Sequence, residues 1–175
     1  MKQKIIKKLE KLNEETFQLY DSLSSLGEKE LHDTSYGWSI IQVFNHLKMA
    51  ELGSVMYMKK KMKAGSEIPD FNVISSIRYF FIKGLLLSSL KWKAPSVVAS
   101  PKGDHSLSEI MNEWKKIREL TKSYIEDYPE DLLGKAVYKH PLAGRLDLAH
   151  AIDSFILHQR HHVHQVSRIR KKINR

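Results

Sequence analysis

Histidines are concentrated near the C-terminus, where four of the nine in the chain lie between residues 158 and 164. At about 100° per residue in a helix, His158 and His162 fall on the same side as the apolar residues of this segment. His161 falls on the flank of that stripe and His164 on the exposed side, so both are poorer ligand candidates. The pattern predicts two imidazoles on the buried face of one helix.

Two imidazoles four residues apart can converge on one cation, because their side chains project from successive turns in the same direction. Two hydrogen-bonded core histidines, or a simple polar seam, would give the same spacing. A third histidine, His46, borders the apolar stripe of another predicted helix. A lone histidine at such a border is more often a satisfied core residue, but three inward histidines from two helices favour a metal site.

Three neutral imidazoles without a thiolate or carboxylate would leave a coordination position open, as in catalytic sites. A metal there would act as a Lewis acid and lower the pKa of a water or thiol. Imidazole suits Zn, Ni or Fe alike, so the ligand type does not select the metal. Gln42 and Gln165 lie one turn from His46 and His162 and are candidates for binding substrate. Capping or surface roles are equally consistent with their positions.

Four long amphipathic segments must position these side chains, and no stretch shows a sustained alternation of period two. Ser39 with Gln42, and Ser106 with Glu109, have the spacing of capping boxes, and Asp147 is a plausible cap for the last helix. We therefore expect an all-α four-helix bundle in a single domain over residues 1–175. The expected helices cover residues 3–25, 39–62, 106–127 and 147 to near the C-terminus, with an extra short helix over 74–91 and a loop containing Pro95 and Pro101.

The region from residue 66 to residue 103 is rich in aromatic side chains, including Tyr79, Phe80, Phe81 and Trp92. These side chains either wall a pocket or complete the core, and we favour the core.

The composition excludes several classes of protein. A length of 175 residues with 42% hydrophobic residues suits one domain with a real core, and the lack of cysteine excludes disulfides and thiolate metal sites. No apolar stretch is long enough to span a bilayer, and charges interrupt residues 1–15 where a signal peptide needs an apolar block. We expect a cytoplasmic protein with no membrane partner.

The formal net charge of +9 would favour contact with anions such as nucleic acid or acidic lipid. Much of the surplus, however, lies in Lys59–Lys63 and Arg168–Arg175, at the ends of predicted helices where cations offset the helix dipole. The chain has no zinc-finger, RNA-recognition or phosphate-loop signature. A nucleic-acid partner is therefore not expected, although binding through the basic C-terminal segment stays a third hypothesis.

Several short motifs follow one another over nearly the whole chain. These motifs are Gly37-Trp38-Ser39-Ile40; Phe44-Asn45-His46-Leu47 with Glu51; Lys93-Ala94-Pro95 with Pro101; His140-Pro141-Leu142-Ala143-Gly144-Arg145-Leu146; and His158, Arg160, His161, His162 and Gln165. Taken together and in this order, they resemble the motifs of the DinB-like (DinB/YfiT) family. We interpret His140-Pro141 structurally, as part of a turn that positions the last helix.

The resemblance implies a four-helix bundle that is often a homodimer. It also implies a divalent metal held by one histidine of the second helix and two of the last, which here are His46, His158 and His162. Several relatives resemble transferases that join a low-molecular-weight thiol to a small electrophilic substrate, and others resemble metal-dependent hydrolases. The alternative is a non-catalytic metal-binding or interaction bundle in stress response, since a fold does not guarantee a chemistry.

Overall fold

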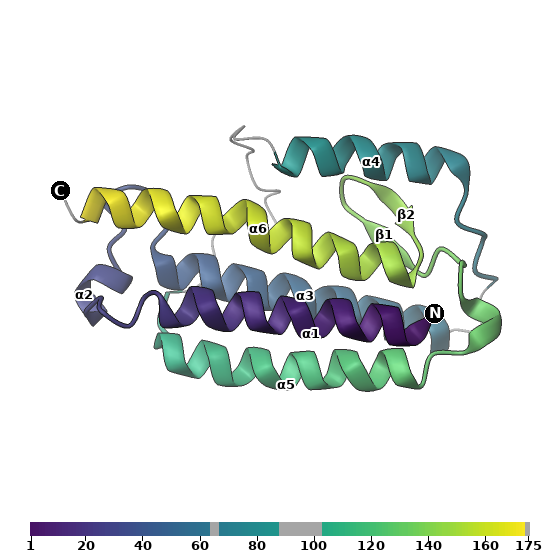
Figure 1. Cartoon of the computed structure of the whole chain (residues 1–175), viewed down its shortest axis with the longest axis horizontal. Coiled ribbons are helices and arrows are strands. Elements are labelled where there is room, and N and C mark those ends of the chain that lie inside the picture. Colours follow the sequence, from purple (N-terminus) through teal and green to yellow (C-terminus); the bar gives the residue numbers. More distant parts are fainter. Residues whose placement is uncertain (64–66, 88–102, 174–175) are drawn as a thin grey trace.

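Four long helices lie side by side in the computed structural model, which describes residues 1–63, 67–87 and 103–173 (Figure 1). Around the bundle, α1 contacts α5 and α6, and α3 contacts the same two helices. The predicted all-α four-helix bundle is confirmed. The elements in chain order are α1 (Lys2–Asp21), α2 (Glu28–Leu31), α3 (Ile40–Lys63), α4 (Val73–Leu87), α5 (Leu107–Glu126), the 3-10 turn η2 (Glu130–Leu132), β1 (Tyr138–His140), β2 (Gly144–Leu146) and α6 (Leu148–Ile173).

The predicted caps set the starts of three long helices. The Ser39 N–H donates to Gln42 Oε1 at 2.9 Å, and the Gln42 N–H donates to Ser39 Oγ at 3.2 Å. Ser106 and Glu109 form the same reciprocal pair at the start of α5. Asp147 Oδ1 accepts the backbone N–H of His150 at 2.8 Å at the start of α6. These side chains satisfy backbone donors that have no partner within the helix.

Several local predictions need correction. Helix α1 ends at Asp21 rather than near residue 25, because the chain goes into successive turns from Ser22. Helix α2 occupies part of the segment 27–37, for which no helix was predicted. A short antiparallel hairpin, β1–β2, pairs Tyr138 with Leu146 and His140 with Gly144. The predicted turn at His140-Pro141 therefore exists, but strands too short to show alternation flank it.

The core divides into two clusters along the bundle. One gathers around α1, α6 and the hairpin, and the other lies around the first half of α3 and the start of α5. In the second cluster Phe44 and Trp114 are fully buried, with ring centroids 6.1 Å apart in an edge-to-face arrangement. This cluster fixes the half of α3 that carries His46.

A buried polar cluster joins all four long helices. Arg118 of α5 makes a two-point ion pair with Glu51 of α3, in which Nη2 lies 2.6 Å from Oε1. The same guanidinium donates to Asn13 Oδ1 of α1 at 2.9 Å, and Thr16 of α1 donates to Gln159 Oε1 of α6 at 2.6 Å. A buried charge without its partner is costly, so this cluster disfavours other helix registers.

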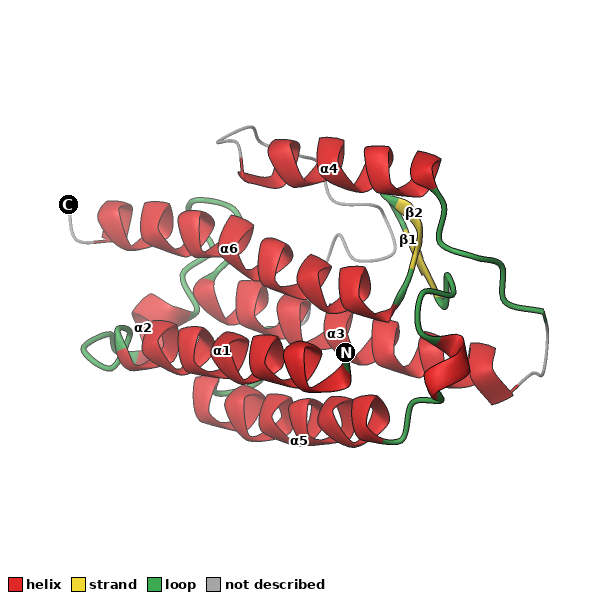
Figure 2. Cartoon of the chain, turned by 45° about the vertical axis from the view of Figure 1, so that its right-hand side comes forward, coloured by secondary structure: helices red, strands yellow, loops and turns green. Residues whose placement is uncertain are grey.

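Helix α4 lies outside the bundle, against α6 and β2 (Figures 1 and 2). It corresponds to the extra helix predicted over 74–91, but residues 88–91 and the loop with Pro95 and Pro101 lie outside the described residues. Tyr79 is buried, whereas Phe80 and Phe81 are exposed. The expectation that these aromatic side chains complete the core is therefore wrong for the two phenylalanines, because α4 turns them away from α6. Trp92 also lies outside the described residues.

None of the helices in the described part of the chain combines the length and the hydropathy that a membrane-crossing segment needs.

Candidate metal centre

Three histidines predicted from sequence meet inside the bundle. His46 comes from the second turn of α3, and His158 and His162 come from successive turns of α6. His158 Nε2 lies 3.1 Å from His46 Nε2 and 3.2 Å from His162 Nε2. One ring nitrogen of each histidine lies within 4.8 Å of the other two. The helical wheel therefore identified the inward positions correctly.

These distances suit a shared cation. Two nitrogens bound to a tetrahedral ion at about 2.0–2.1 Å are about 3.3 Å apart. The two Nε2–Nε2 distances from His158 lie close to that value. Direct hydrogen bonds among neutral rings would also give such distances, but one proton can bridge only two nitrogens at a time. The three nitrogens, all within 4.8 Å of one another, could hold one metal ion.

Burial keeps the three rings neutral. It lowers the pKa of His46 to about 4. Burial, and then the proximity of His46, lowers the pKa of His162 to about 3. The pKa of His158 lies well below its usual value, first because of burial and then because of His162 and His46. Each ring consequently has a free nitrogen lone pair at neutral pH, which metal coordination requires.

Gln165 determines which nitrogen of His162 faces the cluster. Its Oε1 lies 2.8 Å from His162 Nδ1. A carboxamide oxygen only accepts hydrogen bonds, so Nδ1 must carry the proton and Nε2 the lone pair. This contact is typical of residues that orient a metal-ligating histidine. Gln42, by contrast, accepts the Ser39 N–H in the capping box of α3. Substrate binding by either glutamine stays a prediction.

Trp38 packs against two of the three rings. The sequence placed Trp38 in a family motif but did not indicate this role. Its ring lies 5.1 Å from that of His46 and stacks nearly parallel to that of His162 at 6.4 Å, measured between centroids. The preceding Gly37 has φ of 109°, a conformation that side-chain-bearing residues rarely adopt. The tight turn at Gly37 places the indole against one side of the cluster.

His140 is a second residue whose position only the fold reveals. Its Nδ1 accepts the backbone N–H groups of Leu142 and Ala143 at 3.1 and 3.0 Å, so the proton lies on Nε2. Burial lowers the pKa of His140 to about 4. His140 also contributes to the lowered pKa of His158, and the hairpin that carries it contacts α6.

His161 and His164 lie away from the cluster, as the wheel predicted. His164 is exposed and His161 is partly buried. His161 contacts the outer side of His162, with ring centroids 5.3 Å apart. Neither belongs to the group whose nitrogens converge.

A known protein family also matches this chain, and the match covers the same residues. The model of the DinB superfamily matches residues 8–166, a span that includes α3, most of α6 and all three histidines. The chain belongs to the DinB superfamily. The uncharacterized protein YuaE of Bacillus subtilis (strain 168) is 26% identical over 165 residues, which cover 93% of this chain and 97% of YuaE. No solved structure matches the chain.

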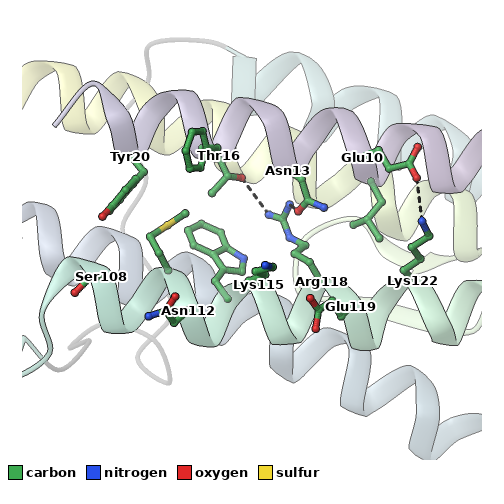
Figure 3. Close-up of a pocket in the computed structure, with 14 residues that line it drawn as sticks. Glu10, Asn13, Thr16, Tyr20, Ser108, Asn112, Lys115, Arg118, Glu119 and Lys122 are labelled. Atoms are coloured by element: carbon green, nitrogen blue, oxygen red, sulfur yellow. Dashed lines mark hydrogen bonds and ion pairs between the residues drawn. The ribbon is translucent and has the colours of Figure 1, made fainter. Parts of the chain in front are cut away.

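A separate groove lies between α1 and α5 (Figure 3). Its volume is about 420 Å³, and none of the three clustered histidines lines it. Arg118 and Thr16 form its polar floor, while Glu10 and Lys122 pair across one end. Arg118 already forms an ion pair with Glu51, so its positive charge is not available to bind a ligand in this groove. The groove therefore offers mainly a packing surface. The histidine cluster is the stronger candidate for chemistry.

Proposed function

We propose that this member of the DinB superfamily is a metal-dependent enzyme, a thiol transferase or a hydrolase, acting at His46, His158 and His162. The observation that supports the proposal most is the convergence of three Nε2 atoms, with spacings of 3.1 and 3.2 Å from the central His158.

The donor set fits a divalent cation such as Zn, Ni or Fe. Three neutral imidazoles supply three ligands, and no carboxylate oxygen belongs to the cluster of ligand atoms among the described residues. When bound there, such a cation would supply Lewis acidity and lower the pKa of a thiol or water in the open position.

The side chains around the cluster have distinct parts in this proposal. Gln165 holds the His162 ring in the tautomer that presents Nε2. Trp38 covers His46 and His162 with an apolar surface, which limits access by bulk water and strengthens electrostatic interactions inside. In this proposal the bound thiol or water is the nucleophile, and the side chains described around the cluster position the reactants.

A low-molecular-weight thiol and a small electrophile are the proposed substrates of the transferase reading. The thiol would lose its proton, its sulfur would bond to the electrophilic carbon, and the leaving group would depart with the electron pair. In the hydrolase reading, water takes the place of the thiol. Both readings come from the family resemblance and share the same histidine site. A homodimer and a cytoplasmic location also stay predictions.

His158→Ala tests the proposal, because His158 is the central ligand. Protein purified without an affinity tag should lose metal by elemental analysis, and should lose thiol-conjugating or hydrolytic activity in parallel. Circular dichroism should show an intact helical fold. His164→Ala is the matched control, since His164 is an exposed histidine of the same helix, and it should keep both properties.

Two outcomes would count against the proposal. Equal metal content in the wild type and His158→Ala would remove the proposed metal site. A metal-loaded wild type without turnover on any thiol, electrophile or hydrolysable ester would instead support the non-catalytic bundle.

A further inference from the structure

The outer face of α4 is unusually apolar for a helix that faces solvent. Five apolar side chains of this face are between 63% and 73% exposed, and they recur at helical spacing along one stripe. Ser75 and Tyr79 on the opposite side are buried against the protein. The residues of this outer face are Val73, Ile74, Ile77, Phe80 and Phe81.

Such a stripe needs a partner. Single exposed apolar side chains are common, but a contiguous group on one helix usually marks an interaction surface. The helix also lies on the outside of the molecule, beyond α6 and the hairpin, in both views (Figures 1 and 2). A broad, flat surface could therefore reach the outer face along its length.

Positive charge borders the stripe. On a helical wheel, Arg78 and Lys83 lie on opposite edges of the outer face. Both side chains are exposed, and neither forms an ion pair with a described residue. The sequence has no aspartate or glutamate between Asp70 and Asp104, although that stretch also contains Lys91, Lys93 and Lys102.

Two acidic groups lie on the other side of the helix. Asp147 and Asp153 of α6 raise the pKa of Tyr79, which faces the protein. They do not offset the positive charge on the outer face. An apolar stripe with a cation on each edge is typical of helices that lie in the interface of an anionic membrane.

We propose that the outer face of α4 docks this protein onto an anionic phospholipid surface, with the helix lying parallel to the membrane. A second copy of the chain suits the face less well. A symmetric pair would bring Arg78 and Lys83 of both copies to one interface, and this stretch supplies no carboxylate to pair with them. Lipid phosphate groups supply the missing negative charge.

This proposal departs from the sequence-based expectation of no membrane partner. That expectation rested on the lack of a spanning segment and on cations at helix ends. Neither observation concerns a helix lying on the surface of a bilayer. Only the structure shows which side of α4 faces outward.

Co-sedimentation of the full-length protein with vesicles tests the proposal. Binding is expected to vesicles of equimolar phosphatidylglycerol and phosphatidylcholine, and to be at least about tenfold weaker to phosphatidylcholine alone. Raising the salt concentration from about 0.05 M to about 0.5 M should weaken binding to the anionic vesicles, because the Debye length shortens.

Variants separate the two parts of the surface. Phe80→Ser with Phe81→Ser should reduce the partition coefficient about tenfold or more, since binding scales with buried apolar area. The matched control is Phe17→Ser, at a similarly exposed phenylalanine of α1. Arg78→Gln with Lys83→Gln should cost about fivefold per cation. Its control is Lys4→Gln with Lys7→Gln, which changes the net charge equally at exposed positions of α1.

The proposal is overturned if the wild type does not bind anionic vesicles, or if the α4 variants bind as well as their controls. A further overturning result is a dimer in analytical ultracentrifugation that Phe80→Ser with Phe81→Ser dissociates, without vesicle binding by the wild type. That result would assign the outer face to a second copy. Circular dichroism of each variant verifies that its helices are intact.

Discussion

Replacing Gln165 should weaken metal binding without disturbing the fold. Its Oε1 accepts a hydrogen bond from His162 Nδ1 at 2.8 Å. This hydrogen bond keeps the proton on Nδ1 and the Nε2 lone pair directed at the cluster. In Gln165→Ala the His162 ring loses this acceptor and is free to take the other tautomer. In part of the population Nε2 then carries the proton, and the metal must displace that proton in order to bind.

The size of the effect follows from the burial of this contact. Removing a residue that orients a metal ligand typically costs about 10–100-fold in affinity, or about 1.4–2.7 kcal/mol. Gln165 is only partly buried, so a water molecule can replace the lost acceptor in part. We therefore expect a loss near tenfold. Gln165→Glu keeps the acceptor and adds negative charge, so its affinity should equal or exceed that of the wild type.

The assay is a competition titration of metal-free protein with Zn²⁺ and a chromophoric chelator at neutral pH. His164→Ala, the exposed neighbour of Gln165, is the control and should bind Zn²⁺ like the wild type. A Gln165→Ala affinity within about twofold of the wild-type value would refute the reasoning, because the contact with Nδ1 would then have no influence on His162 as a ligand.

Three further predictions concern the bundle around the site. Arg118→Met should lower the free energy of unfolding in urea by about 3–5 kcal/mol, because it leaves Glu51 buried without a countercharge; a loss below about 1 kcal/mol would contradict the role given to this pair. Ser106→Ala should cost about 1 kcal/mol in the same measurement, through the lost cap of α5, and an unchanged midpoint would show that the cap is dispensable. In metal-free protein, the pKa of His46 lies at about 4 when folded against 6.5 as its ordinary value. The unfolded chain then binds more protons between these values, so His46 alone should lower the free energy of unfolding by roughly 3 kcal/mol as the pH drops from about 6.5 to about 4. The other buried histidines add to this fall, so His46→Gln should make the slope smaller without removing it. An equal slope in both proteins would count against the buried neutral ring.

Much of the helical framework was predictable because its signals are local. The capping boxes at Ser39 and Ser106 act over three residues, and the apolar periodicity of each long helix is complete within its own segment. The end of α1 and the hairpin at residues 138–146 were not predictable in the same way. Leu23 is buried although it follows the helix, so its apolar character alone extended the predicted helix too far.

The candidate site was likewise predictable from the sequence only in part. Spacing alone placed His158 and His162 on one side of a helix and His46 at the border of another apolar stripe, and the family resemblance implied the same three ligands. Trp38 and His140 gave no comparable signal, because their positions depend on a turn at Gly37 and on a hairpin formed by distant segments. The orienting contact of Gln165 likewise became specific only when the orientation of the His162 ring was known.

The amino-acid sequence by itself determined which residues form the long helices and which face of each is apolar, because propensity, capping and periodicity act within a few turns. Tertiary packing decided which helix faces meet, and so brought nitrogens from α3 and α6 to within 3.1 Å of one another. It also decided that the apolar stripe of α4 points outward, away from α6. Periodicity identifies an apolar face, but only the competition among all such faces for a limited interior determines which one stays exposed.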